Sequence, residues 1–320
     1  MTSDFAFGLR LPVVAAPMFL VSGPKLVTSA CRAGIVGSFP TPNCRTVAEL
    51  DTWLGTITDD LRSAAAAGET VAPWAVNLVT HSTNARLADD LALVAEYKPP
   101  IVITALGSPA PAVDVVRSYG GVIFADVVSL RLARKAVAAG VDGLACVSAG
   151  AGGHTGHLSP FAFVSAIRDF FDGLVAVGGG IGGGAAVAGA VAAGADLVYM
   201  GTRFLASDES LAPDAYKQMI VDHGPDDLIV SAAITGTPAS WLRPSLEACG
   251  MDPDALAGTT IPKDYTAGDA AHKRWKDVWA AGQGLETIRR VQSVREIVDE
   301  LDRDYSAAAQ RFARVSGLAG

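Results

Sequence analysis

Short apolar runs recur eight times over the first two-thirds of the chain, and this repetition constrains the fold more than any other feature. Each run is continuous rather than alternating, which is typical of strands covered on both faces. Most are followed by alanine-rich stretches with helical spacing, which predicts strands alternating with helices. The runs are Leu11–Ala16, Gly34–Ser38, Trp74–Leu78, Ile101–Thr104, Val122–Ala125, Gly143–Val147, Leu174–Val177 and Leu197–Met200.

The residues that separate these runs also follow a repeated pattern. Val127–Ala139 has apolar positions at helical spacing, Gly140 ends that helix, and Asp142 begins the next unit. The segment Ala139–Gly143 is similar in sequence to Ala193–Leu197. Eight β-α units of this kind predict an α/β fold, the (β/α)8 TIM barrel. A doubly wound open sheet is the alternative.

The chain divides into two parts by composition. Residues 1–205 carry the repeats and are predicted to form the barrel, with a longer excursion at 39–73 that contains a helix-like stretch, Thr46–Ala67. Residues 206–285 are richer in charge, proline and tryptophan, and we expect a smaller, mainly helical domain on the substrate side. Glu286–Val315 is amphipathic and predicted to be helical, so that 286–320 returns to the barrel.

Charge and cysteine usage exclude several classes of function. Lys and Arg total 25 against 33 Asp and Glu in 320 residues, without a basic cluster, so we expect no nucleic-acid partner. The four cysteines are far apart and read as reduced thiols, which fits a cytoplasmic protein without a zinc site. No secretory signal or membrane span is expected, because the longest apolar runs are broken by glycine and alanine. The sequence leaves open whether the protein is a homodimer.

The sixth strand leads into a run of small residues followed by an imidazole, Ser148-Ala149-Gly150-Ala151-Gly152-Gly153-His154. Consecutive Gly and Ala make a poor core and a poor helix, so their presence favours close approach of a ligand to the backbone. His154 is the first bulky polar group and would point at that ligand. The alternative is a flexible loop with an incidental histidine.

Glycine-rich turns follow the last two strands. The seventh strand runs into Gly178–Gly184 and an alanine-rich helix, and the eighth into Gly201 and Thr202. In TIM barrels these two loops form the usual phosphate site, with a helix N-terminus favouring the anion. Tight turns without a ligand are the alternative. A Rossmann fold would place its glycines in the first turn, which instead reads Ala16-Pro17-Met18.

Other strand ends add candidate site residues. Ala16, Pro17 and Met18 offer small groups and a thioether to an aromatic ring, although Met is often ordinary core. Asn77 ends the third strand and suits a heterocycle edge or a turn, and Asp126 after the fifth is a site residue or a helix N-cap. Convergence of such groups at one end of the strands predicts an active site there.

These motifs resemble the nitronate monooxygenases, and the resemblance spans most of the chain. It rests on Ala16-Pro17-Met18, Asn77, Ala151–Gly156, Gly178–Gly180 and Gly201-Thr202-Arg203-Phe204, with Trp275–Trp279 and Ala281–Gly284 similar to the family's late segment. The Ala-Gly-Gly-His core is shared with flavin-dependent enoyl-acyl-carrier-protein reductases and NADH:quinone reductases.

The resemblance implies a TIM barrel that binds FMN without a covalent link. It places the phosphate on Gly179, Gly180, Gly201 and Thr202, in a turn that includes Gly178. The ring would lie against Ala16, Pro17 and Met18, with Asn77 and Ser148 at the ring or ribityl chain, Gly153 in close backbone contact and Asp126 near the flavin. Asp126 stands where some members have lysine and Ser148 where others have glutamine, so redox tuning cannot be carried over.

The implied reaction is oxidation of alkyl nitronates by O2 to a carbonyl compound and nitrite. His154 would act as acid or base, or hold the nitronate oxygens when protonated. His157 lacks further ligands at metal spacing, so we expect no metal and a solvent-facing or helix-start role. His81 is expected to line the substrate mouth, and His223 and His272 to lie on the surface.

Two other functions remain open at this point. The first keeps the flavin but makes the protein an NAD(P)H-dependent reductase of quinones or enoyl thioesters. The second is a barrel that binds a phosphorylated ligand without redox chemistry, such as an isomerase or a ligand-binding regulator. Rapid anaerobic bleaching of the flavin by NADH would favour the first, and a colourless purified protein the second.

Overall fold

The computed structural model describes residues 7–256, 259, 261 and 275–317, and a closed barrel of eight parallel strands lies at its centre. Every predicted apolar run overlaps one barrel strand, so the predicted TIM barrel is confirmed and the open sheet is wrong. In barrel order the strands are β1 (Val13–Ala15), β2 (Val36–Pro40), β3 (Trp74–Val79), β4 (Ile101–Ala105), β5 (Val122–Val127), β6 (Gly143–Val147), β8 (Leu174–Gly178) and β9 (Leu197–Met200).

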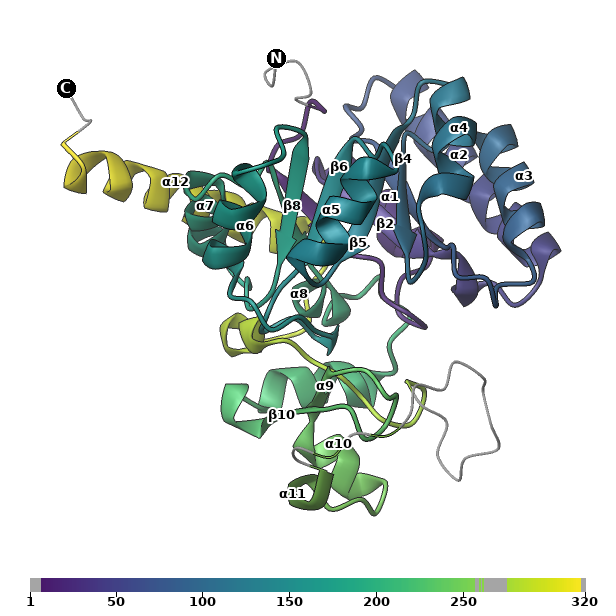
Figure 1. Ribbon diagram of the computed structural model, residues 1–320. Helices are drawn as coiled ribbons and strands as arrows, with labels where there is room; N and C mark the ends of the chain where they lie inside the picture. Colours follow the sequence, from purple (N-terminus) through teal and green to yellow (C-terminus); the bar gives the residue numbers. More distant parts are fainter. Residues whose placement is uncertain (1–6, 257–258, 260, 262–274, 318–320) are drawn as a thin grey trace.

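Helices between the strands cover the outside of the barrel (Figure 1). None of the described helices has the length and apolar character needed to cross a membrane. The helices between the strands are α1 (Pro24–Ala33), α2 (Val47–Ala66), α3 (Leu87–Tyr97), α4 (Ala110–Ser118), α5 (Leu130–Ala138), α6 (Pro160–Arg168) and α7 (Gly184–Ala192), and α8 (Thr202–Leu205) follows the last strand, β9.

Two helix starts follow from capping side chains. Thr46 caps α2 by accepting the N–H of Glu49, close to the predicted start of that helix. Helix α5 begins later than predicted, because β5 continues to Val127 and Ser129 caps the helix through the N–H of Leu132. Asp126 is therefore a strand residue and does not cap the helix.

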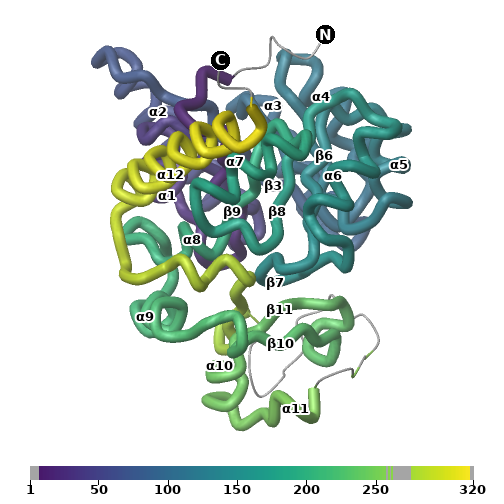
Figure 2. Tube along the Cα trace, turned by 90° about the vertical axis from the view of Figure 1, so that its left-hand side faces the viewer, coloured from purple at the N-terminus to yellow at the C-terminus, as the bar shows by residue number. Residues whose placement is uncertain are grey.

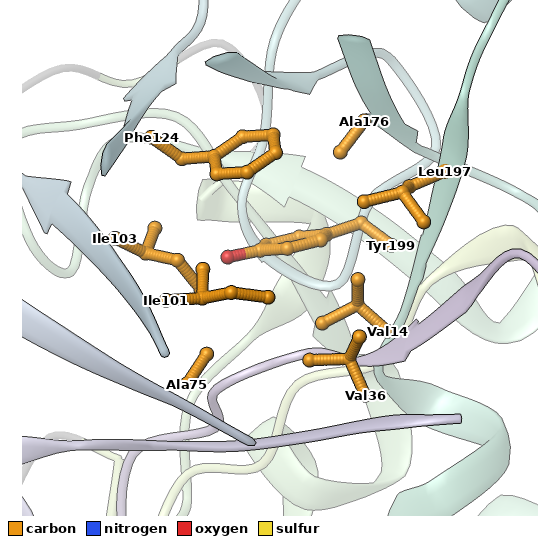
Figure 3. A pocket seen from close by; sticks show the side chains of 9 residues that line it. All are labelled: Val14, Val36, Ala75, Ile101, Ile103, Phe124, Ala176, Leu197 and Tyr199. Atoms are coloured by element: carbon orange, nitrogen blue, oxygen red, sulfur yellow. The ribbon is translucent and has the colours of Figure 1, made fainter. Parts of the chain in front are cut away.

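The barrel interior is apolar over most of its depth. Side chains alternate along each strand, so every second residue points inward. A small interior cavity is lined by Val14, Val36, Ala75, Ile101, Ile103, Phe124, Ala176, Leu197 and Tyr199, and Figure 3 shows the Tyr199 ring crossing it.

A smaller unit lies below one end of the barrel in Figure 1. It contains α9 (Asp214–Asp222), β10 (Leu228–Ser231), β11 (Ala239–Leu242), α10 (Arg243–Ala248), α11 (Pro253–Leu256) and short 3-10 helices at Pro225–Asp227 and Gln283–Thr287. The two strands were not predicted. β10 pairs with β11, and β11 pairs with β7 (Gly153–His154) from the loop after β6, in a sheet of order β10-β11-β7.

The last helix, α12 (Val294–Val315), packs against α7 and α1 on the barrel wall (Figure 2). It starts later than the predicted 286, at a capping box in which Ser293 and Glu296 bind each other's backbone N–H. Gly184 allows the close approach to α7, since a Cβ there would lie 2.0 Å from the carbonyl oxygen of Leu301. Arg10 ties the first strand to the same helix through Asp299, at 2.6 Å.

Candidate active site

The turn after β1 forms a fixed shelf at the C-terminal end of the barrel. Asn43, from a 3-10 helix at Thr41–Asn43, accepts the N–H of Leu20 at 2.8 Å and donates to the carbonyls of Met18 at 3.1 Å and Ser22 at 2.7 Å. Leu20 has φ 62°, an unusual conformation for a residue with a Cβ, and these bonds hold it. The amide of Asn43 thus fixes the half-buried residues Ala16–Met18.

This shelf adjoins the turn after β9. The N–H of Ala16 donates to the carbonyl of Met200 at 3.0 Å, and a Cβ on Gly201 would lie 3.5 Å from the sulfur of Met18. The predicted ring shelf and one half of the predicted phosphate turn therefore share one end of the barrel.

The turn after β8 offers free backbone donors. Gly179 and Gly180 have φ of 142° and 69°, values that favour glycine. The N–H of Gly180 donates to the carbonyl of Gly150 at 3.0 Å, whereas those of Gly179, Gly182 and Gly183 have no acceptor in the described part of the chain. Such free N–H groups before helix α7 suit an anion.

Residues 281–284 of the smaller unit join the three turns. The N–H of Gln283 donates to the carbonyl of Gly150 at 2.9 Å, alongside Gly180. The N–H of Gly282 donates to the hydroxyl oxygen of Thr202 at 2.9 Å, which leaves the Thr202 hydroxyl hydrogen available to a ligand. The loops after β6, β8 and β9 are therefore parts of one site.

Some glycines in these loops serve backbone packing. A Cβ on Gly182 would lie 2.2 Å from the carbonyl oxygen of Gly284, and a Cβ on Gly152 would lie 2.7 Å from the nitrogen of Gly282. At Gly180 a Cβ would meet only the Gln283 side chain, at 3.7 Å. Gly180 and Gly201 therefore leave space for a ligand, whereas Gly152 and Gly182 are packed against the backbone of the smaller unit.

His154 lies in strand β7, in backbone pairing with the smaller unit. It is opposite Ala239 of β11, and Gly153 before it has φ 64°. The next residue, Thr155, donates its N–H to the carbonyl of Pro238 at 3.0 Å and its hydroxyl to the carbonyl of Ser148 at 3.0 Å. The histidine is therefore held on a strand rather than on a flexible loop.

Trp275 packs against the imidazole of His154. The two ring centroids are 5.1 Å apart with an interplanar angle of 81°, an edge-to-face contact. Trp241 of β11 supports Trp275 from behind, at 4.6 Å between centroids. Aromatic rings of the smaller unit thus fix the orientation of His154.

A buried polar group lies inside the barrel near the same end. Asn77 of β3 donates to Oδ2 of Asp126 at 3.3 Å and to the carbonyl of Ile103 at 3.1 Å. Burial raises the pKa of Asp126 to about 7, against the hydrogen bond from Asn77 and the influence of the Tyr199 hydroxyl, which both lower it. Oδ1 of Asp126 and the Tyr199 hydroxyl are buried without a regular hydrogen-bond partner in the described residues.

Ser148 is buried where the loop after β6 meets the turn after β8. Its side chain is fully buried, and its hydroxyl donates to the carbonyl of Cys146 at 3.4 Å. Its backbone N–H donates to the carbonyl of Gly178 at 2.8 Å. The structure therefore gives Ser148 a role in closing the loop after β6 onto the turn after β8.

The remaining histidines differ in their surroundings. His157 is exposed, and His223 is partly buried with Nδ1 2.9 Å from the carbonyl oxygen of Met219. His81 lines an open hollow after β2, β3 and β4, with Pro42, Val79, Thr83, Asn84 and Leu106. His272 lies outside the described residues. Within those residues no group of three acidic, histidine or cysteine side chains could hold a metal ion.

The residues present fit a flavin mononucleotide. Free N–H groups at Gly179, Gly182 and Gly183 and the Thr202 hydroxyl suit its phosphate, and the open faces of Gly180 and Gly201 leave space for it. The shelf at Ala16–Met18 suits a flat ring. The unpaired oxygens of Asp126 and Tyr199 lie at the same end of the strands.

Comparison with known proteins identifies the family. Residues 4–304 match the sequence profile of the nitronate monooxygenases, which is nearly the whole chain. The chain belongs to the nitronate monooxygenase family. It is therefore an oxidoreductase, and its predicted family is confirmed.

Curated relatives are similar at modest identity. A nitronate monooxygenase of Paraburkholderia phytofirmans is 28% identical over 347 aligned positions, covering 95% of each chain. A protein of Rhodococcus jostii named (3aS,4S,5R,7aS)-5-hydroxy-7a-methyl-1-oxo-octahydro-1H-indene-4-carboxyl-CoA dehydrogenase is 29% identical, covering 75% of this chain and 64% of that protein.

Solved structures share the fold. FabK from Thermotoga maritima superposes with a TM-score of 0.78 at 23% identity, covering 98% of this chain and 99% of that one. A nitroalkane oxidase from Streptomyces ansochromogenes also gives 0.78 at 23% identity, covering 95% and 98%. The barrel with its smaller unit is thus a fold that this chain shares with these two structures.

Four residues of the site were missed by sequence reasoning. Tyr199 could have been found, because it alternates with the inward Leu197 two residues before Gly201. Asn43 follows the second strand, a strand end that was not considered. Trp275 and Gln283 are far from the barrel strands in sequence, and no local pattern places them beside His154 and Gly150.

Proposed function

We propose that this protein uses FMN to oxidise alkyl nitronates with O2, giving a carbonyl compound and nitrite. The observation that carries the proposal is the joining of the loops after β6, β8 and β9 at Gly150 and Thr202, with His154 on the first of these loops. A bound flavin would supply the transfer of electrons from the substrate to oxygen. The substrate partners are then a nitronate or nitroalkane and O2.

In this proposal separate groups of residues bind the phosphate, the ring and the substrate. The N–H groups of Gly179 and Gly183 and the hydroxyl of Thr202 hold the phosphate. The shelf at Ala16–Met18 supports the ring, with Asn77 and Asp126 at its polar edge. His154, oriented by Trp275, removes the acidic carbon-bound proton of a neutral nitroalkane or, when protonated, holds the nitronate oxygens.

The smaller unit, residues 206–285, would close the substrate side of this site, and residues 286–320 would complete the barrel. Residues 281–284 support this assignment because they bind the loops after β6 and β9. The four unpaired cysteines are compatible with a cytoplasmic protein, and a homodimer remains a prediction.

The test compares His154→Ala with the wild type on two substrates, a neutral nitroalkane and its pre-formed nitronate. Loss of a general base lowers turnover of the neutral form by roughly a hundredfold to ten-thousandfold and spares the nitronate. Loss with both forms indicates binding or electrostatic stabilisation. Nitrite release is the measurement, and His157→Ala, an exposed histidine on the same loop, is the matched control.

Unchanged turnover of both substrates in His154→Ala would contradict the assigned role. A separate result would contradict the reaction: no nitrite from any nitronate tested with the FMN-loaded wild type.

A second candidate function is an FMN-dependent reductase that takes electrons from NAD(P)H and gives them to a quinone or an enoyl thioester. The similarity to a protein named as a carboxyl-CoA dehydrogenase favours this alternative. Anaerobic mixing with NADH discriminates the two. Rapid bleaching of the bound flavin supports the reductase, and a flavin that stays oxidised supports the nitronate reaction.

A further inference from the structure

Asp126 is a carboxyl group inside the barrel without a positive partner. It points inward near the C-terminal end of β5, where Oδ2 accepts from Asn77 of β3 at 3.3 Å. Its other oxygen, Oδ1, is buried and makes no regular hydrogen bond. Among the described residues no lysine, arginine or histidine forms an ion pair with it.

Tyr199 of β9 presents a hydroxyl to the same region. That hydroxyl is also buried without a regular partner, and Asp126 is the polar group that interacts with it. Figure 3 shows the Tyr199 ring crossing the barrel toward Ile101 and Ile103, with Phe124 beside it. Two buried oxygens therefore interact in surroundings that are apolar apart from the Asn77 amide.

Burial decides which protonation state of Asp126 is favoured here. The Tyr199 hydroxyl can donate to an ionised carboxylate, whereas a protonated carboxyl can also donate to the phenol oxygen. Burial disfavours the ionised carboxylate because no counter-charge compensates the lost hydration. Burial raises the pKa of both Tyr199 on β9 and Cys146 on β6, and the charge of Asp126 raises both further, against Arg168 in the case of Cys146.

We propose that Asp126 is a proton-binding positioning residue that shares its proton with Tyr199 and sets the electron affinity of the flavin site. The inference rests on the proposed flavin binding. The neutral carboxyl places no charge beside the ring. The ionised carboxylate places a negative charge there, in surroundings of low dielectric, and opposes the gain of electrons.

The proton itself is tested without flavin. Infrared titration of the apoprotein between pH 5 and pH 9 is expected to show a carboxylic C=O band that disappears near neutral pH. The band should be absent in Asp126→Asn, shifted in frequency in Tyr199→Phe, and unchanged in Asp169→Asn, an exposed carboxylate on the barrel surface. A band that is absent from the wild type, or present in Asp126→Asn, overturns the proposal.

Coupling to the flavin is tested by the midpoint potential of bound FMN. Between pH 6 and pH 8, the ratio of the affinities for reduced and oxidised FMN should fall in the wild type. This fall should exceed any fall in Asp126→Asn by roughly tenfold to a hundredfold. Parallel pH profiles of the two proteins overturn the tuning role even if the infrared band is present. Failure of the wild type to bind FMN would instead refute the proposed function, and the infrared band would still decide the shared proton.

Discussion

At the scale of single residues, Asp126 makes the folded state sensitive to pH. The folded pKa is raised to about 7, against about 4 in an unfolded chain. Below pH 4 both states hold the proton and Asp126 has no effect. Between about pH 4 and pH 7 only the folded state holds it, so the free energy of unfolding falls as the pH rises, by at most about 1.4 kcal/mol per unit.

Asp126→Asn is therefore expected to remove that decline. Urea unfolding of both proteins at several pH values between 4.5 and 7.5 measures it, as the difference between their unfolding free energies. A difference that does not change with pH would mean that Asp126 is ionised throughout the range in the folded protein.

Two glycines, one in the turn after β8 and one in α7, should respond to alanine substitution with opposite changes in stability. Gly182→Ala places a Cβ about 2.2 Å from the carbonyl oxygen of Gly284, so the turn must move and FMN affinity and stability should both fall. Gly189→Ala, inside α7, meets nothing within 4 Å and should stabilise the protein by about 0.5–1 kcal/mol through helix propensity. Thermal unfolding with and without FMN measures both effects; equal behaviour of the variants would contradict the packing described.

At the scale of elements, Arg203 joins the phosphate turn to α12. This arginine follows Thr202 in α8, is 5% exposed, and pairs with Glu300 of α12 at 2.6 Å. Burial lowers the pKa of Arg203, and Glu300 opposes that change. The ion pair thus connects the C-terminal helix with a loop that is proposed to bind FMN.

Glu300→Ala leaves a buried guanidinium without its carboxylate, and the expected cost is about 3–5 kcal/mol of unfolding free energy. Glu286→Ala breaks an exposed pair with Arg289 and should cost less than about 1 kcal/mol. Chemical unfolding of the two variants tests the contrast. Similar costs would show that Arg203 finds another partner.

The barrel elements could be predicted because each strand is buried on both faces and is therefore a continuous apolar run. The strands of the smaller unit could not, because β10 and β11 lie outside the repeated strand and helix pattern and β7 consists of a glycine and a histidine. Their partners lie far apart in sequence, so pairing rather than local preference decides them. For the same reason the contact of Trp275 with His154 was not foreseen, whereas the prediction of His154 as a site residue came from its own loop.

At the scale of the whole molecule, the termini of several strands and the smaller unit enclose one site. The fold and the family are established by the closed barrel and by the match of residues 4–304. The proposed phosphate site depends on contacts between units, in particular the N–H of Gly282 on the hydroxyl of Thr202 at 2.9 Å. Binding of FMN should accordingly stabilise the barrel and the smaller unit together.

Titration of the apoprotein with FMN, followed by flavin fluorescence, tests the central claim most directly. The wild type should bind one FMN per chain with saturation. Thr202→Val keeps the side-chain shape but loses the hydroxyl, and should bind roughly tenfold to a hundredfold more weakly. A wild type that does not saturate, or a Thr202→Val variant of equal affinity, would contradict the account.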